Sequence, residues 1–254
     1  MGDTGAETAR RAEPATKSKP PKPGSKKAQL LKKQSDAAGA SPAPGAAAAQ
    51  AGPAEPPAAA VHGAVVVLVF RDARTLKAAL DRPHVAYEGG TLKGPLKGVN
   101  FPLSALADWD KRTPDKTPAE QDLLALVARL ASSPAASASG DDAAPPAAEP
   151  LQYLIAGLRG DRSTFVHEWA HARFFLDASF RAAATAIWDE LDADLKRAIE
   201  RELAMRNYRP DVFIDEFQAY ICETPDDFGR RWGPRLREHH VRIRALVSAP
   251  PNLC

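Results

Sequence analysis

His167, Glu168 and His171 have side chains and a spacing that could do chemistry together. If the segment is helical, residues four apart lie one turn apart and about 40° offset, so both imidazoles can reach one metal ion. Glu168 is displaced by about 100°, and its carboxylate can reach a metal-bound water without ligating the metal. Zinc in such a site lowers the pKa of its water to about 7, while the glutamate carries the proton to the leaving group. The pattern predicts a hydrolytic metal site.

The alternative interpretation is an ordinary helix with two packed or solvated histidines and one exposed acid. The flanking sequence argues against a fully exposed face because it leaves little of the helix polar: Phe165, Val166, Trp169, Ala170, Phe174 and Phe175. Two histidines on a mostly buried helix need polar partners. A shared metal ion is one way to provide them.

A catalytic zinc requires a third protein ligand. In the metzincin pattern a glycine follows the second histidine by three residues and the third ligand follows it by six. Phe174 and Asp177 occupy these positions here. A residue six positions further along the same helix points about 240° away from His171, so Asp177 is a weak candidate.

A better candidate lies downstream, where Phe213, Glu216, Phe217 and Tyr220 follow the i, i+3, i+4, i+7 spacing of one helix face. An unpaired charge in this aromatic stripe would be costly to bury, and a metal ion would remove that cost. Asp215 falls on the adjoining stripe, so periodicity alone does not choose between the two acids. The alternative is an acid that pairs with a lysine or arginine of a neighbouring helix.

Taken together, residues 151–223 resemble the gluzincin type of zinc metallopeptidase, with the HExxH motif on one helix and a glutamate on a later one. The resemblance implies one zinc ion held by His167, His171 and Glu216, with Glu168 as the general base. It also implies a zincin-like fold and a peptide or protein substrate. Asp215 then becomes a partner of a ligand histidine.

The resemblance further suggests that Leu151–Leu158, the strand before the motif helix, is an edge strand on which an extended substrate pairs through its backbone. No oxyanion-stabilising motif is recognisable. Tyr220, one turn beyond Glu216, is a candidate for this catalytic role, as are His239 and His240. The alternatives are a core tyrosine with a bonded hydroxyl and two surface histidines.

The elements that must position these residues follow from periodicity and turn signals. Strands are expected at Val65–Phe70, His84–Glu88 and Leu151–Leu158, with residues 89–104 mostly loop after a break at Pro83. Helices are expected at Ala73–Leu80, Pro118–Ala131 with Thr117 as N-cap, Ser163–Leu176 with Ser163 as cap, Phe180–Trp188, Glu190–Arg206, Val212–Glu223 and Pro225–Val247. The fold class is therefore α+β, with a small sheet and a helix-dominated C-terminal half.

Two segments have the composition of disordered chain. Residues 1–60 contain nine of the 23 prolines and 18 alanines but no Val, Ile, Phe, Tyr or Trp, so they cannot bury enough apolar area to offset ordering entropy. Residues 132–150 are similarly low in complexity. The prediction is a disordered tail at 1–60 and one domain at 61–254 with a flexible insert at 132–150.

Charge and hydropathy exclude several classes of protein. The net charge of +2 divides into +4 for residues 1–60 and −2 for the remainder, which therefore lacks the basic excess of a nucleic-acid-binding domain. No apolar run approaches the roughly 20 residues that span a bilayer. The absence of a secretory signal and the presence of only two cysteines favour an intracellular protein, cytoplasmic or nuclear.

Two functions remain. The first is a zinc-dependent metallopeptidase that hydrolyses peptide bonds. The second is a catalytically silent protein that retains the zincin-like fold and interacts with partners through its disordered tail.

Overall fold

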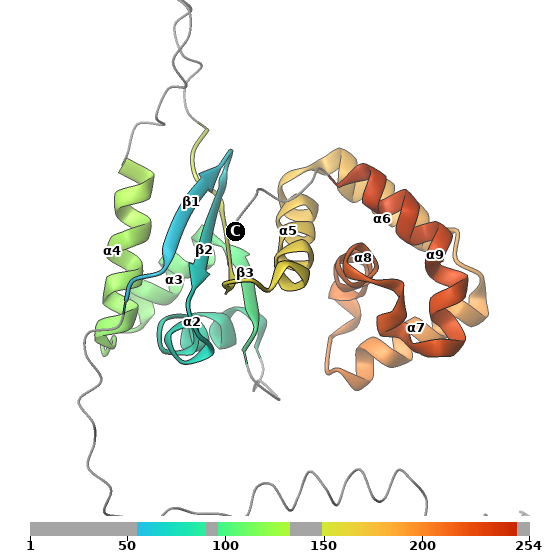
Figure 1. Cartoon of the computed structure of the whole chain (residues 1–254), viewed down its shortest axis with the longest axis horizontal. Helices are drawn as coiled ribbons and strands as arrows, with labels where there is room; N and C mark the ends of the chain where they lie inside the picture. Colours follow the sequence, from blue (N-terminus) through green and yellow to red (C-terminus); the bar gives the residue numbers. More distant parts are fainter. Residues whose placement is uncertain (1–54, 90–95, 133–148, 248–254) are drawn as a thin grey trace, which may run out of the picture. The chain divides into compact units, whose positions relative to one another are not determined.

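The computed structural model describes residues 55–89, 96–132 and 149–247. Most of the predicted tail and insert therefore lies outside the described residues. Within the described part, helices surround a small four-stranded mixed sheet, which confirms the α+β class (Figure 1). The first strand, β1 (Ala58–His62), begins three residues before the predicted domain boundary. No helix in the described ranges is long and apolar enough to cross a membrane.

The sheet has the strand order β1-β2-β4-β3. β2 (Val65–Phe70) and β4 (Tyr153–Leu158) pair in parallel at its centre, and β1 and β3 (Gly98–Pro102) add antiparallel on the outside. The prediction that Leu151–Leu158 is an edge strand is therefore wrong. β4 is buried along almost its whole length, as expected of an internal strand that is covered on both faces.

The predicted strand His84–Glu88 and the predicted break at Pro83 are also wrong, because both lie in one helix, α2 (Ala73–Glu88). Asp72 caps the helix by accepting a hydrogen bond from the Thr75 amide at 2.9 Å. The helix continues through Pro83, which is buried with its neighbours on the face that packs on the sheet. Burial of this face offsets the lost backbone hydrogen bond.

The segment 89–104, predicted as mostly loop, contains the edge strand β3 and the first residues of α3 (Leu103–Arg112). Val99 and Phe101 alternate with Asn100 and are each 1% exposed, which is the burial pattern of a strand. Gly98 and Pro102 stand at the ends of the strand, where residues of these types are tolerated.

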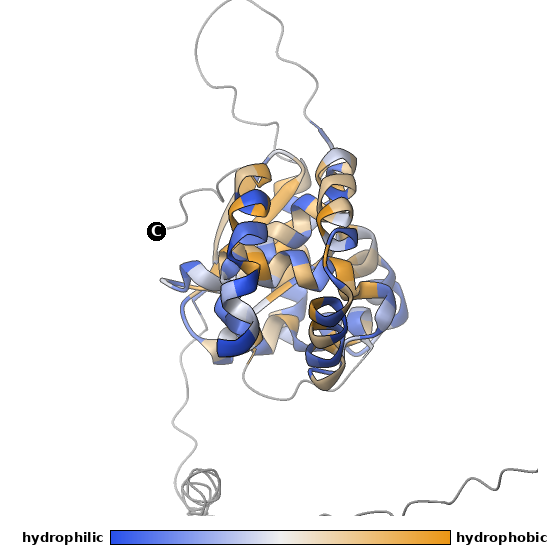
Figure 2. Ribbon diagram, turned by 90° about the vertical axis from the view of Figure 1, so that its right-hand side faces the viewer, coloured by the Kyte–Doolittle hydropathy of each residue, from blue (hydrophilic) through white to orange (hydrophobic). Residues whose placement is uncertain are grey.

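Alternating residues of β2 face two different layers of helices. Val66, Leu68 and Phe70 pack in a core with α2, α3 and α4 (Pro118–Ser132). Val65, Val67 and Val69 pack in a second core with the C-terminal helices α5 (Arg162–Leu176), α6 (Ala178–Asp189), α7 (Ala193–Met205), α8 (Phe213–Glu223) and α9 (Gly229–Leu246). Figure 2 shows mainly hydrophobic strands and helices of mixed polarity around them.

The expected helices after residue 117 are all present, with small differences at their ends. Thr117 caps α4 by accepting a hydrogen bond from the Glu120 amide at 3.3 Å, and the Glu120 carboxylate accepts one from the Thr117 amide at 2.7 Å. Asp161, rather than the predicted Ser163, caps α5. The 3₁₀ turns η2 (Pro210–Val212) and η3 (Pro225–Phe228) precede α8 and α9.

Candidate metal centre

The HExxH motif lies in the middle of α5, which is packed between the sheet and α8. Asp161 accepts hydrogen bonds from the amide and the hydroxyl of Thr164, at 3.1 and 2.8 Å, and so fixes the start of the helix. His167 and His171 then stand one turn apart on the same face. Their Nε2 atoms lie 3.2 Å from each other.

Glu216 on α8 lies beside these two nitrogens. Its Oε1 is 3.9 Å from His171 Nε2, and one ligand atom from each of His167, His171 and Glu216 lies within 4.8 Å of the others. All three residues are largely buried, and Glu216 Oε2 has no hydrogen-bond partner among the described residues. This group could hold a metal ion, because it presents two imidazoles and an unsatisfied carboxylate to one point.

Carboxylates also occupy the other side of both imidazoles. Asp215 Oδ1 lies 2.8 Å from His171 Nδ1, and Glu223 Oε2 lies 3.3 Å from His167 Nδ1. The Asp215 contact orients the His171 ring, whereas Glu223 lies within ion-pair distance of His167 without a hydrogen bond to Nδ1; in both rings Nε2 is directed toward the common point. Of the two acids that periodicity could not separate, Glu216 faces the Nε2 atoms of the two histidines and Asp215 contacts Nδ1 of His171.

The electrostatics of the group favour a cation at the common point. Burial raises the pKa of Glu216 to about 7. Burial alone would lower the pKa of His171, but the carboxylates of Asp215 and Glu216 outweigh it and raise this pKa to about 10. A divalent cation at the common point would favour an ionised Glu216 and replace the proton on His171.

Glu168 takes no part in the three-residue group and is held from the edge strand instead. Asn100 Nδ2 on β3 donates a hydrogen bond to Glu168 Oε2 at 2.8 Å, and the Tyr153 hydroxyl donates to Asn100 Oδ1 at 2.6 Å. The second bond fixes which end of the Asn100 amide faces Glu168. Sequence analysis missed both residues, since neither has a spacing that links it to the motif.

Gly98 allows β3 to approach the motif helix this closely. A Cβ atom at this position would collide with the Thr164 methyl group and with Glu168 Oε1. The absence of a side chain at Gly98 is therefore a steric requirement for the Asn100–Glu168 contact.

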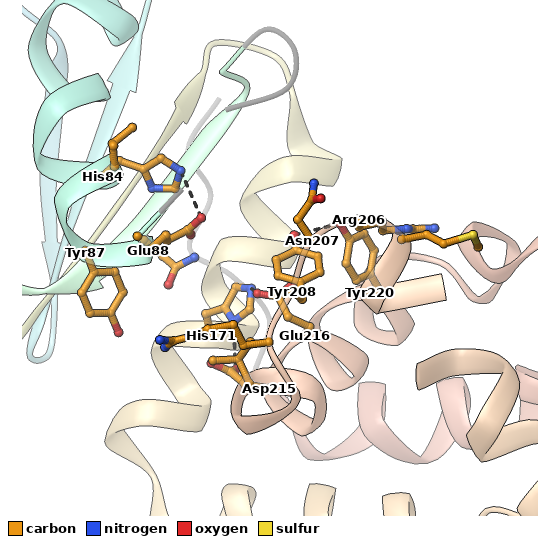
Figure 3. A pocket seen from close by; sticks show the side chains of 16 residues that line it. His84, Tyr87, Glu88, His171, Arg206, Asn207, Tyr208, Asp215, Glu216 and Tyr220 are labelled. Atoms are coloured by element: carbon orange, nitrogen blue, oxygen red, sulfur yellow. Dashed lines mark hydrogen bonds and ion pairs between the residues drawn. The ribbon is translucent and has the colours of Figure 1, made fainter. Parts of the chain in front are cut away.

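Tyr220 lies next to the group, with its ring centroid 4.7 Å from that of His167. Its hydroxyl is 3.1 Å from the hydroxyl of Tyr208, and the guanidinium carbon of Arg206 lies 4.5 Å from its ring centroid. Both tyrosines line a cavity of about 590 Å³ together with Asn100, His171 and Glu216 (Figure 3). Tyr208 was not identified from the sequence.

The remaining candidates lie elsewhere. Asp177 caps α6 through the amides of Ser179 and Phe180. His240 Nδ1 is 2.5 Å from the carbonyl oxygen of Ile221, and neither His239 nor His240 lines the cavity. We therefore assign none of these three residues to the centre.

Comparisons with known proteins assign no family. No protein-family model, curated protein or solved structure matches this chain. The chemistry must therefore be argued from the geometry of the site.

Proposed function

We propose that this chain is a zinc-dependent metallopeptidase of the gluzincin type, with a zincin-like fold, and that it hydrolyses peptide bonds. One observation carries the proposal: His167, His171 and Glu216 converge on one buried point at the wall of a cavity. The general-base candidate Glu168 lies on the same helix and is held separately by Asn100.

The two histidines and Glu216 would hold the zinc ion and leave one position open, as three-ligand catalytic sites do. When bound, zinc supplies an activated water and a Lewis acid for the substrate carbonyl. Asp215 and Glu223 keep the imidazoles oriented from behind.

Glu168 would take a proton from the attacking water and deliver it to the leaving amine. Asn100 holds Oε2, and Oε1 would make this transfer. The Tyr220 hydroxyl, beside His167, is the candidate donor to the negative charge that develops on the carbonyl oxygen.

The outer edge of β3 supports an extended peptide substrate. β3 pairs only with β4 in the described sheet, packs against α5 and carries Asn100 into the cavity. A peptide that pairs with this edge would pass alongside the candidate centre. The edge strand expected at Leu151–Leu158 is thereby replaced by Gly98–Pro102.

Metal content gives the first test. Purified wild-type protein, His167→Ala and Glu216→Ala are compared by elemental analysis. We expect about one equivalent of zinc in the wild type and much less in both variants. Less than half an equivalent in the wild type, unchanged in the variants, contradicts the zinc site.

Cleavage of a diverse peptide library gives the second test. We expect the wild type to cleave, and Glu168→Gln to keep zinc and fold but lose at least a hundredfold in rate. Glu200→Gln on α7 is the control for loss of an acid elsewhere. A zinc-loaded wild type that cleaves no peptide would favour the non-catalytic interaction protein.

A further inference from the structure

The cavity in front of the candidate metal centre has a second wall that the proposed chemistry does not use. His171, Asp215 and Glu216 line one side, and the last turn of α2 contributes His84, Tyr87 and Glu88 to another (Figure 3). A substrate bound at the centre would therefore also face this turn.

Glu88 lines the cavity without a lysine or arginine partner among the described residues. Its only ion-pair partner among them is His84, whose Nε2 lies 3.4 Å from Glu88 Oε2. Burial lowers the pKa of His84, so the imidazole is neutral near pH 7. The pair thus retains the charge of the carboxylate.

The basic side chains that line the cavity are paired with other acids. Arg206 lies 3.2 Å from Glu202, and Arg209 lies 3.1 Å from Asp211. Neither arginine has an ion pair with Glu88.

The surroundings of Glu88 favour a cation. Burial, followed by the nearby charge of Glu168, raises the pKa of Glu88 to about 7; His171 and His167 oppose this shift, and Asp215 adds to it. A positively charged group placed against Glu88 would relieve this repulsion.

His84 provides an independent sign of a ligand. It is 5% exposed and lines the cavity, and its Nδ1 has no hydrogen-bond partner among the described residues. A buried polar atom of this kind normally has a partner. An ammonium group has three donors, and it would contact Glu88 and this enclosed nitrogen together once the His84 ring turns toward the cavity.

We propose that the α2 wall is a subsite for a positively charged group of the substrate, a protonated amine or guanidinium, anchored by Glu88 and oriented by His84. The inference rests on the proposed peptidase function and adds a substrate class to it. Two parts of a peptide could supply this positive charge: a lysine or arginine side chain, or the free amino terminus.

Matched peptides test the inference. A series of pentapeptide amides places a lysine at each position in turn. For every lysine peptide a counterpart carries norleucine at the same position. All of these peptides are made both with a free and with an acetylated amino terminus. We expect higher kcat/KM for peptides with a cation at one defined position, and the lysine and acetylation series show whether that cation is the side chain or the terminus.

Two substitutions then connect this preference to Glu88. Glu88→Gln should lower kcat/KM for the preferred peptide about 10- to 100-fold and leave its neutral counterpart nearly unchanged. Glu88→Lys should reverse the preference. Asp81→Asn, on the same helix but outside the cavity lining, should retain it. Equal rates for charged and neutral peptides, or equal losses on both in Glu88→Gln, would overturn the inference.

A binding measurement separates this inference from the peptidase proposal. Calorimetry with Glu168→Gln protein, which is not expected to turn over substrate, compares the same cationic and neutral peptides with and without Glu88→Gln. Binding that depends on the cation and on Glu88, without cleavage by the wild type, would reject the peptidase and retain the subsite. Cleavage by the wild type, with binding that depends neither on the cation nor on Glu88, would retain the peptidase and reject the subsite.

Discussion

At the scale of residues, the candidate centre is organised by which atom of each side chain is occupied. Asp215 contacts Nδ1 of His171 at hydrogen-bond distance, Glu223 lies within ion-pair distance of Nδ1 of His167, and both Nε2 atoms face Glu216. Asn100 likewise engages one oxygen of Glu168 and leaves the other. The contacts of the surrounding residues Asp215, Glu223 and Asn100 therefore determine which atoms of the centre remain available for chemistry.

The HExxH residues could be identified from the sequence because helical periodicity relates them to one another, and Glu216 was identified through the aromatic stripe around it and the gluzincin resemblance. Asn100, Tyr153 and Glu223 could not, because no spacing joins a polar residue on one element to its partner on another. Between Asp215 and Glu216 the helix period gave no preference. Only the packing of α8 on α5 decides which acid faces the imidazoles.

The Asp215–His171 pair leads to a prediction about proton release. Because Asp215 and Glu216 hold the pKa of His171 near 10, zinc must displace a proton from this ring at pH 7.5. In Asp215→Asn the largest contribution that raises this pKa is lost while burial still lowers it, so the pKa of His171 should fall. Calorimetry in buffers of different ionisation enthalpy should show that Asp215→Asn releases fewer protons than the wild type on binding zinc.

Asp211→Asn removes a nearby acid that pairs with Arg209, and it should release as many protons as the wild type. Equal proton numbers for Asp215→Asn and the wild type would mean that His171 is already neutral in the metal-free protein.

At the scale of elements, the helices from α4 to α9 agree with the sequence, whereas α2 and β3 do not. Pro83, Gly98 and Pro102 are local signals for turns, and the burial of their neighbours overrides them. The strand order is a further feature that sequence cannot supply. β3 lies next to α5 although about 60 residues separate them, and this contact brings Asn100 to Glu168.

The close approach of β3 to α5 predicts a large effect of Gly98→Ala. The new methyl group would push Glu168 Oε1 and Thr164 away, so Asn100 would no longer hold the carboxylate. We expect the peptidase rate to fall at least tenfold and stability to fall by about 1–3 kcal/mol, as is usual for overpacking. Library cleavage and urea unfolding measure the two effects.

Gly157→Ala is the matched control, because Gly157 is the register partner of Gly98 in the β3–β4 ladder. The three atoms nearest to its new methyl group would be carbons of the Phe165 ring, at 3.0–3.3 Å, rather than atoms of Thr164 or Glu168 as at Gly98. A comparable loss of activity in both variants would show that Gly98 acts through the sheet rather than through the general base.

At the scale of the whole molecule, the candidate centre and its cavity are formed by helices that belong to two different hydrophobic cores. The candidate metal ligands come from α5 and α8 on one face of the sheet, while the cavity is completed by α2 from the layer on the other face. A metal that crosslinks α5 and α8 binds the folded chain and not the unfolded one. It should therefore stabilise the whole domain.

This coupling predicts a stability that depends on both pH and metal. Glu216 has a pKa of about 7 when folded and about 4.5 when unfolded, so between these values the folded, metal-free protein binds more protons. Its stability should fall as pH rises from about 5 to 7, by roughly 3 kcal/mol from this group at about 1.4 kcal/mol per pKa unit. Urea unfolding in chelator should show this slope in the wild type and a flatter one in Glu216→Gln.

Glu238→Gln, at an exposed position on α9, should keep the wild-type slope. Added zinc should reverse the trend in the wild type, because binding requires an ionised Glu216 and neutral imidazoles and therefore strengthens as pH rises. A wild type and a Glu216→Gln variant with the same pH dependence in chelator would show that the Glu216 carboxylate is not destabilised by its burial between α5 and α8. The electrostatic part of the case for a cation at that point would then fail.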